Sequence, residues 1–195
     1  MPKVIAITGG IGAGKSVVSN ILRFEGFEVY DCDAEAKRLM DESVEIHQML
    51  CSDIHPHAVV DGCIDRKLVS SIVFTDVEKL TKLNEMVHSS VRSDISRWIA
   101  DRAGVTALFI ETAILYQSRL YSMVDMVVEV IAPKELRIQR VMQRNNMTRD
   151  EVEKRIESQN VAIDEKKKIK TINIINDGFT PILPQIKQFL AESEV

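Results

Sequence analysis

The densest cluster of glycines in the chain lies near its N-terminus and constrains the fold more than any other feature. Four of the eight glycines fall within six positions, and the segment from Gly9 to Ser16 matches the pattern G-x-x-x-x-G-K-[ST] of a phosphate-binding loop. Glycines allow successive backbone N–H groups to turn toward an anion, and the start of the following helix adds its dipole. Lys15 supplies a positive charge for the β- and γ-phosphates, and Ser16 supplies a hydroxyl for Mg²⁺.

The residues on either side of this loop predict a buried strand before it and a helix after it. Val4 to Ile7 is a short apolar run rich in β-branched residues, which is typical of a strand buried in a parallel sheet. Apolar residues then recur at helical spacing from Val17 to Phe24. A strand, a glycine-rich turn and a helix in this order are the context that a phosphate-binding loop requires.

Strands and helices are predicted to alternate along most of the remaining chain, which predicts a parallel, doubly wound α/β sheet with right-handed crossovers. The further predicted strands are residues 27–30, 107–110, 127–131 and 172–175. The later predicted helices are residues 133–144, a helix beginning at 148, and residues 181–192.

The stretch that follows the second predicted strand is helical and strand-poor, so we expect it to be an insertion over the carboxyl edge of the sheet. Its clearest element is a long helix whose apolar stripe, from Leu80 to Trp98, is expected to be buried. Nearer the C-terminus, the charged run from Glu165 to Lys168 is expected to be a solvated helix end.

Charge and cysteine content narrow the classes of function. The chain carries 25 Lys and Arg against 29 Asp and Glu, a net charge of −4 without a basic stripe, which argues against a dedicated DNA or RNA binder. We expect no membrane segment, because no apolar run reaches roughly 18 residues. We expect no signal peptide, because the N-terminus lacks the charged, apolar and cleavage regions of one. The three cysteines follow no disulfide or zinc pattern, which favours the reducing cytoplasm.

Two further polar sites each have a functional and a structural interpretation, and the residues alone leave both open. Asp33 follows the second predicted strand, where it serves either as a general base or as the N-cap of a helix. Arg137, Arg140 and Arg144 share one helix face, which either clamps a transferring phosphoryl group or is a solvated surface.

The chain resembles the dephospho-CoA kinase family, and the motifs that carry the resemblance run in order along nearly its whole length. Thr8 to Ser16 is similar to the family's T-G-G-I-G-S-G-K-S, and Asp31 to Asp33 is similar to its D-A-D. The segment from Asp65 to Phe74 resembles D-R-x-x-L…V-F, and the segment from Leu83 to His88 resembles the start of L-x-x-x-x-H-P. The residues similar to the family's lid are Gln143, Arg144, Thr148, Arg155 and Gln159.

The resemblance implies an α/β P-loop kinase-type three-layer fold with a parallel five-stranded sheet, a helical substrate-binding insertion and a lid. It implies ATP-dependent phosphorylation of the ribose 3′-hydroxyl of dephospho-CoA with Mg²⁺, the last step of coenzyme A synthesis. The implied parts of the chain are a nucleotide-binding core at about 1–33, 103–137 and 161–195, an acceptor-binding portion at about 34–102 and a lid at about 138–160.

The resemblance also implies residue roles, position by position. Asp33, Lys15 and Arg140 are implied to be catalytic, with Asp33 as the general base and Ser16 as the Mg²⁺ ligand. The implied nucleotide-binding residues are Gly9, Gly10, Ile11, Gly12, Ala13, Gly14, Lys15, Ser16, Val17, Arg140, Arg144 and Asn176. The implied acceptor-binding residues are Thr8, Asp33, Lys37, Arg66, His88 and Leu115. The implied partners are ATP and dephospho-CoA, with no nucleic acid, membrane or obligate protein partner.

The chain departs from the family pattern at several positions, and two other classes of function stay open. The departures are Val17 for Thr, Lys37 for Arg or His, Val69 for Leu, Ser89 for Pro and Gln117 for Glu. One alternative is another small-molecule or nucleoside monophosphate kinase, against which the segments around Arg66 and His88 argue. The other is a degenerate nucleotide-binding regulator, which would not need to keep Lys15 or Asp33.

Overall fold

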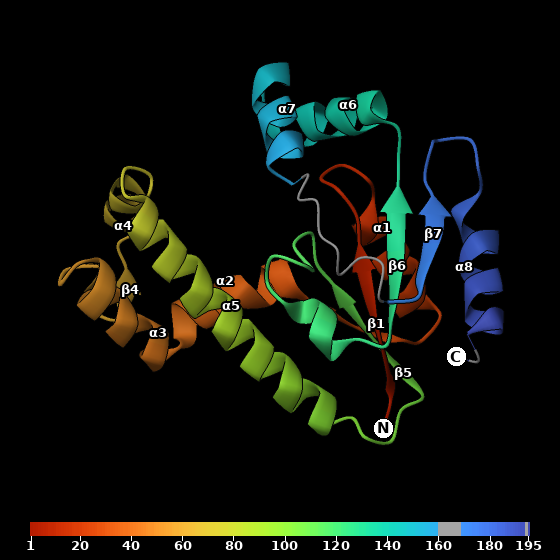
Figure 1. Ribbon diagram of the computed structural model, residues 1–195, viewed down its shortest axis with the longest axis horizontal. Coiled ribbons are helices and arrows are strands. Elements are labelled where there is room, and N and C mark those ends of the chain that lie inside the picture. The colour runs from red at the N-terminus through yellow and green to blue at the C-terminus, as the bar shows by residue number, and fades with distance from the viewer. Residues whose placement is uncertain (160–168, 194) are drawn as a thin grey trace. The chain divides into compact units, whose positions relative to one another are not determined.

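The computed structural model describes residues 1–159, 169–193 and 195, and the chain divides into two compact units (Figure 1). Unit 1 comprises Met1–Asp31 and Arg102–Val195, and unit 2 comprises Cys32–Asp101. The chain therefore leaves unit 1 once, after Asp31, and returns to it at Arg102. The charged run from Glu165 to Lys168 lies outside the described residues.

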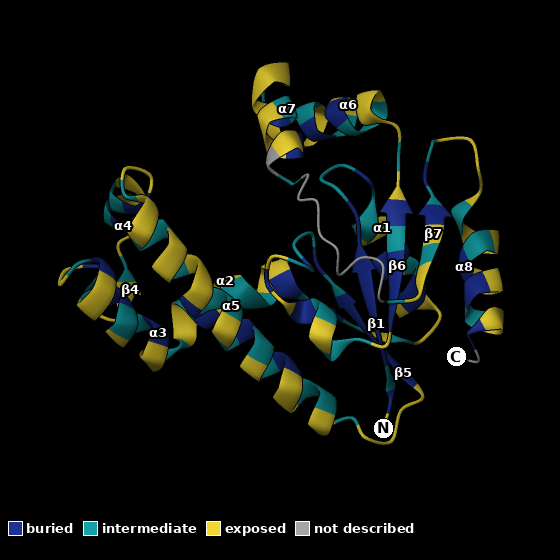
Figure 2. Ribbon diagram, in the orientation of Figure 1, coloured by how far each residue is buried: buried dark blue, intermediate teal, exposed yellow. Residues whose placement is uncertain are grey.

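Unit 1 is built on a five-stranded parallel sheet with the strand order β2-β5-β1-β6-β7, which confirms the predicted α/β sheet. The strands next to one another at its centre, β5 and β1, are buried along nearly their whole length (Figure 2), which explains their continuous apolar sequence. The strands are β1 Lys3–Thr8, β2 Glu28–Asp31, β5 Ala107–Glu111, β6 Met126–Ile131 and β7 Thr171–Ile175.

One face of this sheet packs against two helices, α1 (Lys15–Phe24) and α8 (Ile182–Glu192). Each fully buried aliphatic or aromatic side chain in such a core contributes roughly 1.5–3 kcal/mol to folding. The sheet side chains in this cluster include Ile5, Ile7, Phe109 and Val128, and the helix side chains include Val18, Leu22, Ile186 and Phe189.

Two helices after β6 form a hairpin with a small apolar core of its own (Figure 1). α6 (Lys134–Asn145) follows Pro133 and ends before Asn146, which adopts a left-handed conformation with φ 53°. α7 (Arg149–Ser158) begins with a capping box between Thr148 and Glu151, as the sequence predicted for a helix starting at this threonine. The hairpin core consists of Ile138, Val141, Val152 and Ile156.

Unit 2 is mostly helical, and it also contains a small hairpin that the sequence did not predict. β3 and β4 pair antiparallel over two residues each, around Asp61 and Gly62, which have φ angles of 50° and 76°. Positive φ at both central residues is the geometry of a tight hairpin turn. The elements are α2 Cys32–Glu42, α3 Val44–Met49, the π-helical turn η1 Leu50–Ile54, β3 Val59–Val60, β4 Cys63–Ile64, α4 Arg66–Val73 and α5 Val77–Ala100.

The long predicted helix is α5, which spans 24 residues. The Asp76 carboxylate caps it by accepting hydrogen bonds from the backbone N–H groups of Glu78 and Lys79. Its apolar stripe is only partly buried, because Leu80 and Trp98 keep intermediate exposure. In the part of the chain that the structure describes, no helix combines the length and the apolar character needed to cross a membrane.

Candidate active site

The phosphate-binding loop joins β1 to α1 at the carboxyl edge of the sheet, and two of its glycines allow neighbouring backbone to approach closely. Gly12 has a φ of 77°, and a Cβ at this position would lie 2.6 Å from the carbonyl oxygen of Arg137. A Cβ at Gly9 would collide with the carbonyl oxygen of Val130. A larger residue at either position would therefore push the loop away from β6 or α6.

Lys15 and Ser16 are the first two residues of α1, so the loop ends at the positive end of a helix dipole. The Lys15 ammonium group donates a hydrogen bond of 3.0 Å to the carbonyl oxygen of Gly9 at the other end of the loop. Val17 follows them and is partly exposed. Backbone N–H groups, a helix N-terminus and an ammonium group within one short segment form a site suited to a polyphosphate.

Two of the three arginines on the predicted basic face contact the loop or its support. The Arg137 guanidinium donates through Nε to the carbonyl oxygen of Ile11 at 2.9 Å. Arg140 donates to the backbone and side-chain oxygens of Asn176 at 3.2 and 3.1 Å. Arg144 instead donates to the side chain of Asn145 at 2.8 Å. The structure therefore places Arg137 and Arg140 at the loop and Arg144 at the end of α6.

Asn176 connects three parts of the site. It directly follows β7 and is buried, and its amide group donates 2.8 Å to the carbonyl oxygen of Ala13 in the loop. Its own oxygens accept from Arg140, so one side chain fixes both the loop and the arginine. The nucleotide-binding role of Asn176 was expected only from the family resemblance.

Glu111, a carboxylate that the sequence interpretation did not single out, lies at the same carboxyl edge of the sheet, on the strand between β1 and β2. It is the last residue of β5 and is the register partner of Ile7 in β1 and of Asp31 in β2. Burial raises the pKa of Glu111, the charge of Asp31 raises it further, and Lys15 lowers it. A half-buried carboxylate of this kind is stabilised by a nearby cation. The available signal was an acidic residue that ends an otherwise apolar strand.

The two acceptor-binding candidates in unit 1 are both buried. Thr8 is the last residue of β1 and leads directly into the loop, and Leu115 lies in the segment that follows β5. Near Leu115, burial and the charge of Glu129 raise the pKa of Tyr116. Gln117, which stands where the family has a carboxylate, lies in the same segment.

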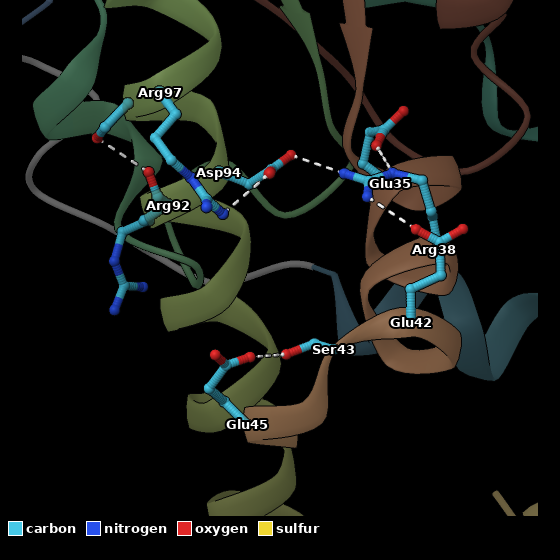
Figure 3. A network of polar contacts seen from close by, with 9 residues as sticks. Glu35, Arg38, Glu42, Ser43, Glu45, Arg92, Asp94 and Arg97 are labelled. Carbon is cyan, nitrogen blue, oxygen red and sulfur yellow. Dashed lines mark hydrogen bonds and ion pairs between the residues drawn. The ribbon is translucent and has the colours of Figure 1, made fainter. Parts of the chain in front are cut away.

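In unit 2, Asp33 and Lys37 lie on α2, which a charged network holds against α5 (Figure 3). Asp33 is in the first turn of α2, where a carboxylate interacts favourably with the helix dipole, and the helix itself begins one residue earlier. Arg38 forms ion pairs with Glu35 at 2.6 Å on α2 and with Asp94 at 3.1 Å on α5 (Figure 3). These partners raise the pKa of Arg38, and they fix the orientation of the helix that carries Asp33.

The other two acceptor-binding candidates of unit 2 lie on separate helices. Arg66 begins α4 and pairs with Asp41 of α2 at 2.5 Å. His88 lies in the middle of α5 and is half-buried, and this burial, together with the charge of Arg92, lowers its pKa. A neutral imidazole at this position can accept as well as donate a hydrogen bond.

Comparisons with known proteins point to one family. The family model described as dephospho-CoA kinase matches residues 3–181. A Bacteroides fragilis protein named dephospho-CoA kinase is 34% identical over 187 residues, covering 96% of this chain and 91% of its own. The crystal structure of a Thermus thermophilus protein aligns with a TM-score of 0.77 and 33% identity, covering 98% of this chain and 96% of its own. A dephospho-CoA kinase structure from Campylobacter jejuni aligns over the full length of both chains, with a TM-score of 0.68 and 25% identity.

Proposed function

The chain belongs to the dephospho-CoA kinase family, and we propose how its own residues carry out the reaction of that family. The reaction is the ATP-dependent phosphorylation of the ribose 3′-hydroxyl of dephospho-CoA, the final step of coenzyme A synthesis. The observation that carries the proposal is a phosphate-binding loop that α6 and Asn176 hold in place, in a chain whose family match extends from residue 3 to residue 181.

In this proposal the loop from Gly9 to Ser16 binds the phosphates of ATP through backbone N–H groups other than that of Ile11, which donates to Gln159. Lys15 neutralises charge on the β- and γ-phosphates both before and during transfer. Arg140, already held beside the loop by Asn176, contributes a second cation. Arg144 exchanges its hydrogen bond with Asn145 for a contact with the nucleotide. Concentrated positive charge in a water-poor site is the main source of catalysis in phosphoryl transfer.

Asp33 acts as the general base that accepts the proton of the ribose 3′-hydroxyl. Its position supports this role, because it follows the last residue of β2 by two residues, at the carboxyl end of an open α/β sheet. Ligands of such sheets bind at that end of the strands. Removal of the proton as the O–P bond forms avoids a positively charged oxygen in the product.

Mg²⁺ fits the donors that unit 1 offers at this edge. The Ser16 hydroxyl and the carboxylates of Asp31 and Glu111 are hard oxygen ligands, and the pKa of Glu111 is raised by burial and by the neighbouring charge of Asp31, an effect that a bound cation would oppose. Among the described residues, no group of three or more His, Cys, Asp or Glu could hold a metal ion. Mg²⁺ is commonly held by one or two carboxylates together with substrate phosphates and water. When bound, Mg²⁺ would neutralise charge on the phosphate oxygens.

We assign acceptor binding residue by residue, as the family resemblance implies. Lys37, Arg66 and His88 of unit 2 offer hydrogen-bond donors for dephospho-CoA, whose pyrophosphate is an anion. Thr8 and Leu115 of unit 1 are assigned by the family resemblance. Both substrates are small molecules, and the proposal includes no nucleic acid, membrane or obligate protein partner. None of the three cysteines forms a disulfide bond, which supports a cytoplasmic location.

A coupled assay of ADP release tests the proposed function. Purified chain is supplied with Mg-ATP and, in parallel, with dephospho-CoA, AMP, CMP or adenosine, and mass spectrometry identifies the product. We expect turnover with dephospho-CoA to exceed turnover with the other acceptors, and Lys15→Ala to serve as the inactive control. Faster turnover with AMP or CMP would identify a nucleoside monophosphate kinase, and no turnover with any acceptor would favour a nucleotide-binding regulator.

A further inference from the structure

Ile11, at the tip of the phosphate-binding loop, contacts the α6–α7 hairpin through its backbone N–H, its carbonyl oxygen and its side chain. Its backbone N–H donates a hydrogen bond of 2.8 Å to the side-chain oxygen of Gln159, which lies directly after α7. Its carbonyl oxygen accepts from Nε of Arg137 on α6 at 2.9 Å. Its side chain packs against the hairpin core that contains Val141 and Val152.

These contacts restrain a peptide that would otherwise be mobile. Glycines flank Ile11 on both sides, and each glycine leaves the backbone with many accessible conformations. The backbone of α6 also approaches the loop so closely that Gly12 has no room for a Cβ. Restraining both polar groups of Ile11 therefore removes conformational freedom that nucleotide binding would otherwise have to remove.

The contact of Arg137 with the loop is made by a partly desolvated cation. Burial lowers the pKa of Arg137, and no carboxylate of the described residues lies within ion-pair distance of it. Its hydrogen bond to the Ile11 carbonyl is charge-assisted, which makes it stronger than a bond between neutral groups. On the other side of Ile11, the side-chain oxygen of Gln159 accepts a hydrogen bond from the backbone N–H.

We propose that Gln159 and Arg137 are positioning residues that hold the tip of the phosphate-binding loop, through Ile11, in its anion-binding shape. The hairpin and the loop then bind phosphate as one preorganised body. Neither residue needs to touch the nucleotide for this effect. The proposal goes beyond the assignment of substrates, since it concerns the shape of the loop and applies to ADP alone.

The test compares Gln159→Met and Arg137→Met with Arg149→Met by calorimetric titration with ADP. Arg149 joins α7 to Glu135 at 2.7 Å and pairs with Glu153 at 3.1 Å, so its replacement weakens the hairpin without removing a contact to the loop. Loss of one such hydrogen bond should weaken ADP binding roughly 3- to 10-fold. The double variant should lose less than the product of the two single losses, because both act on one residue.

Three further readouts separate positioning from general stability and from direct contact. The melting temperature without ligand should fall no more in Gln159→Met than in Arg149→Met. Arg137→Gln, which keeps a donor but removes the charge, should recover most of the ADP affinity lost in Arg137→Met. In turnover assays, the KM for ATP should rise more than kcat falls.

Three outcomes would overturn the proposal. An unchanged ADP affinity in Gln159→Met, or an equal loss in Arg149→Met, would show that Ile11 needs no support from these residues. An Arg137→Gln variant as weak as Arg137→Met would show that Arg137 acts by its charge on the phosphate. Because ADP is the only ligand in the binding experiment, these results do not depend on which acceptor the enzyme phosphorylates.

Discussion

Asp33 is proposed to act only during transfer, so its loss should affect turnover without affecting ATP binding. We expect Asp33→Asn to lower kcat by about 10²–10⁴-fold, the usual range for loss of a general base, and to leave the Kd for ATP nearly unchanged. Steady-state kinetics with dephospho-CoA and direct ATP titration measure the two quantities. Asp53→Asn, a change at an exposed aspartate of the same unit, is the control. A variant with near-normal turnover would show that Asp33 serves only the helix dipole.

Lys15 is proposed to act both in binding and in transfer. We expect Lys15→Ala to reduce kcat by at least about 10²-fold, because a charge that stabilises the transition state is commonly worth roughly 3 kcal/mol. Lys134→Ala, at an exposed position on α6, should behave as the wild type. The same ADP-release assay measures both variants. A wild-type turnover rate in Lys15→Ala would contradict the proposed phosphate-binding role of the loop.

His88 should make the stability of the protein depend on pH. Its pKa is lowered below 6.5 in the folded protein, mainly by burial, so the unfolded state binds the proton more tightly. This contribution to stability is fully present above about pH 6.5 and is lost as pH falls through the lowered pKa. The melting temperature should therefore fall less on acidification in His88→Gln than in the wild type, and His57→Gln should follow the wild type. An equal fall of the melting temperature with decreasing pH in all three proteins would contradict this prediction.

At the level of single residues, the sequence predicted groups that belong to a local motif better than groups brought together by the fold. Lys15 and Ser16 were found because the glycines before them define a pattern. Glu111 was missed, since its partners Ile7 and Asp31 are far away in sequence and become neighbours only through strand register. The contact between Gln159 and Ile11 spans 148 positions and leaves no periodic signal.

At the level of elements, the strands that the sequence predicted correctly are those that are long and buried. β1, β5 and β6 are buried in a parallel sheet, so their apolar sequences are continuous and easily recognised. The β3–β4 hairpin was not predicted, because two residues per strand are too few to show alternation. The pair Asp61 and Gly62 favours a tight hairpin turn, but a turn signal alone does not show that strands flank it.

The α6–α7 hairpin should become more resistant to protease when nucleotide binds. We expect ATP to slow cleavage within 138–159, because bound nucleotide further stabilises the hairpin that already packs against the loop. Mg-ATP with acceptor should slow cleavage more, because the full set of substrates excludes water from the reacting phosphate and covers this segment. Arg140→Ala should weaken protection and turnover more than Arg144→Ala, since only Arg140 contacts the support of the loop in this structure. Lys154→Ala should have little effect. Mass spectrometry of the cut sites decides the outcome, and equal cleavage with and without nucleotide would refute the lid assignment.

At the level of the whole molecule, the two units should respond to different ligands. All the contacts described around the phosphate-binding loop come from residues 1–31 and 102–195. In hydrogen-exchange mass spectrometry, ADP should therefore slow exchange in the loop and α6, and dephospho-CoA should slow exchange in α4 and α5 of unit 2. Protection of α4 and α5 by ADP alone, with none at the loop, would contradict this division of roles.

The tight packing at Gly9 and Gly12 means that natural selection acts on the loop for two separate reasons. In the proposed function both glycines take part in binding nucleotide. The packing also requires both for folding, because carbonyl oxygens of β6 and α6 occupy the space of a side chain. A gene copy that had lost its activity would keep these glycines for as long as its product stayed folded. In such a lineage, the retained glycines would show only that the protein still folds. Substitutions at charged positions such as Lys15 and Asp33 would show that catalysis was lost.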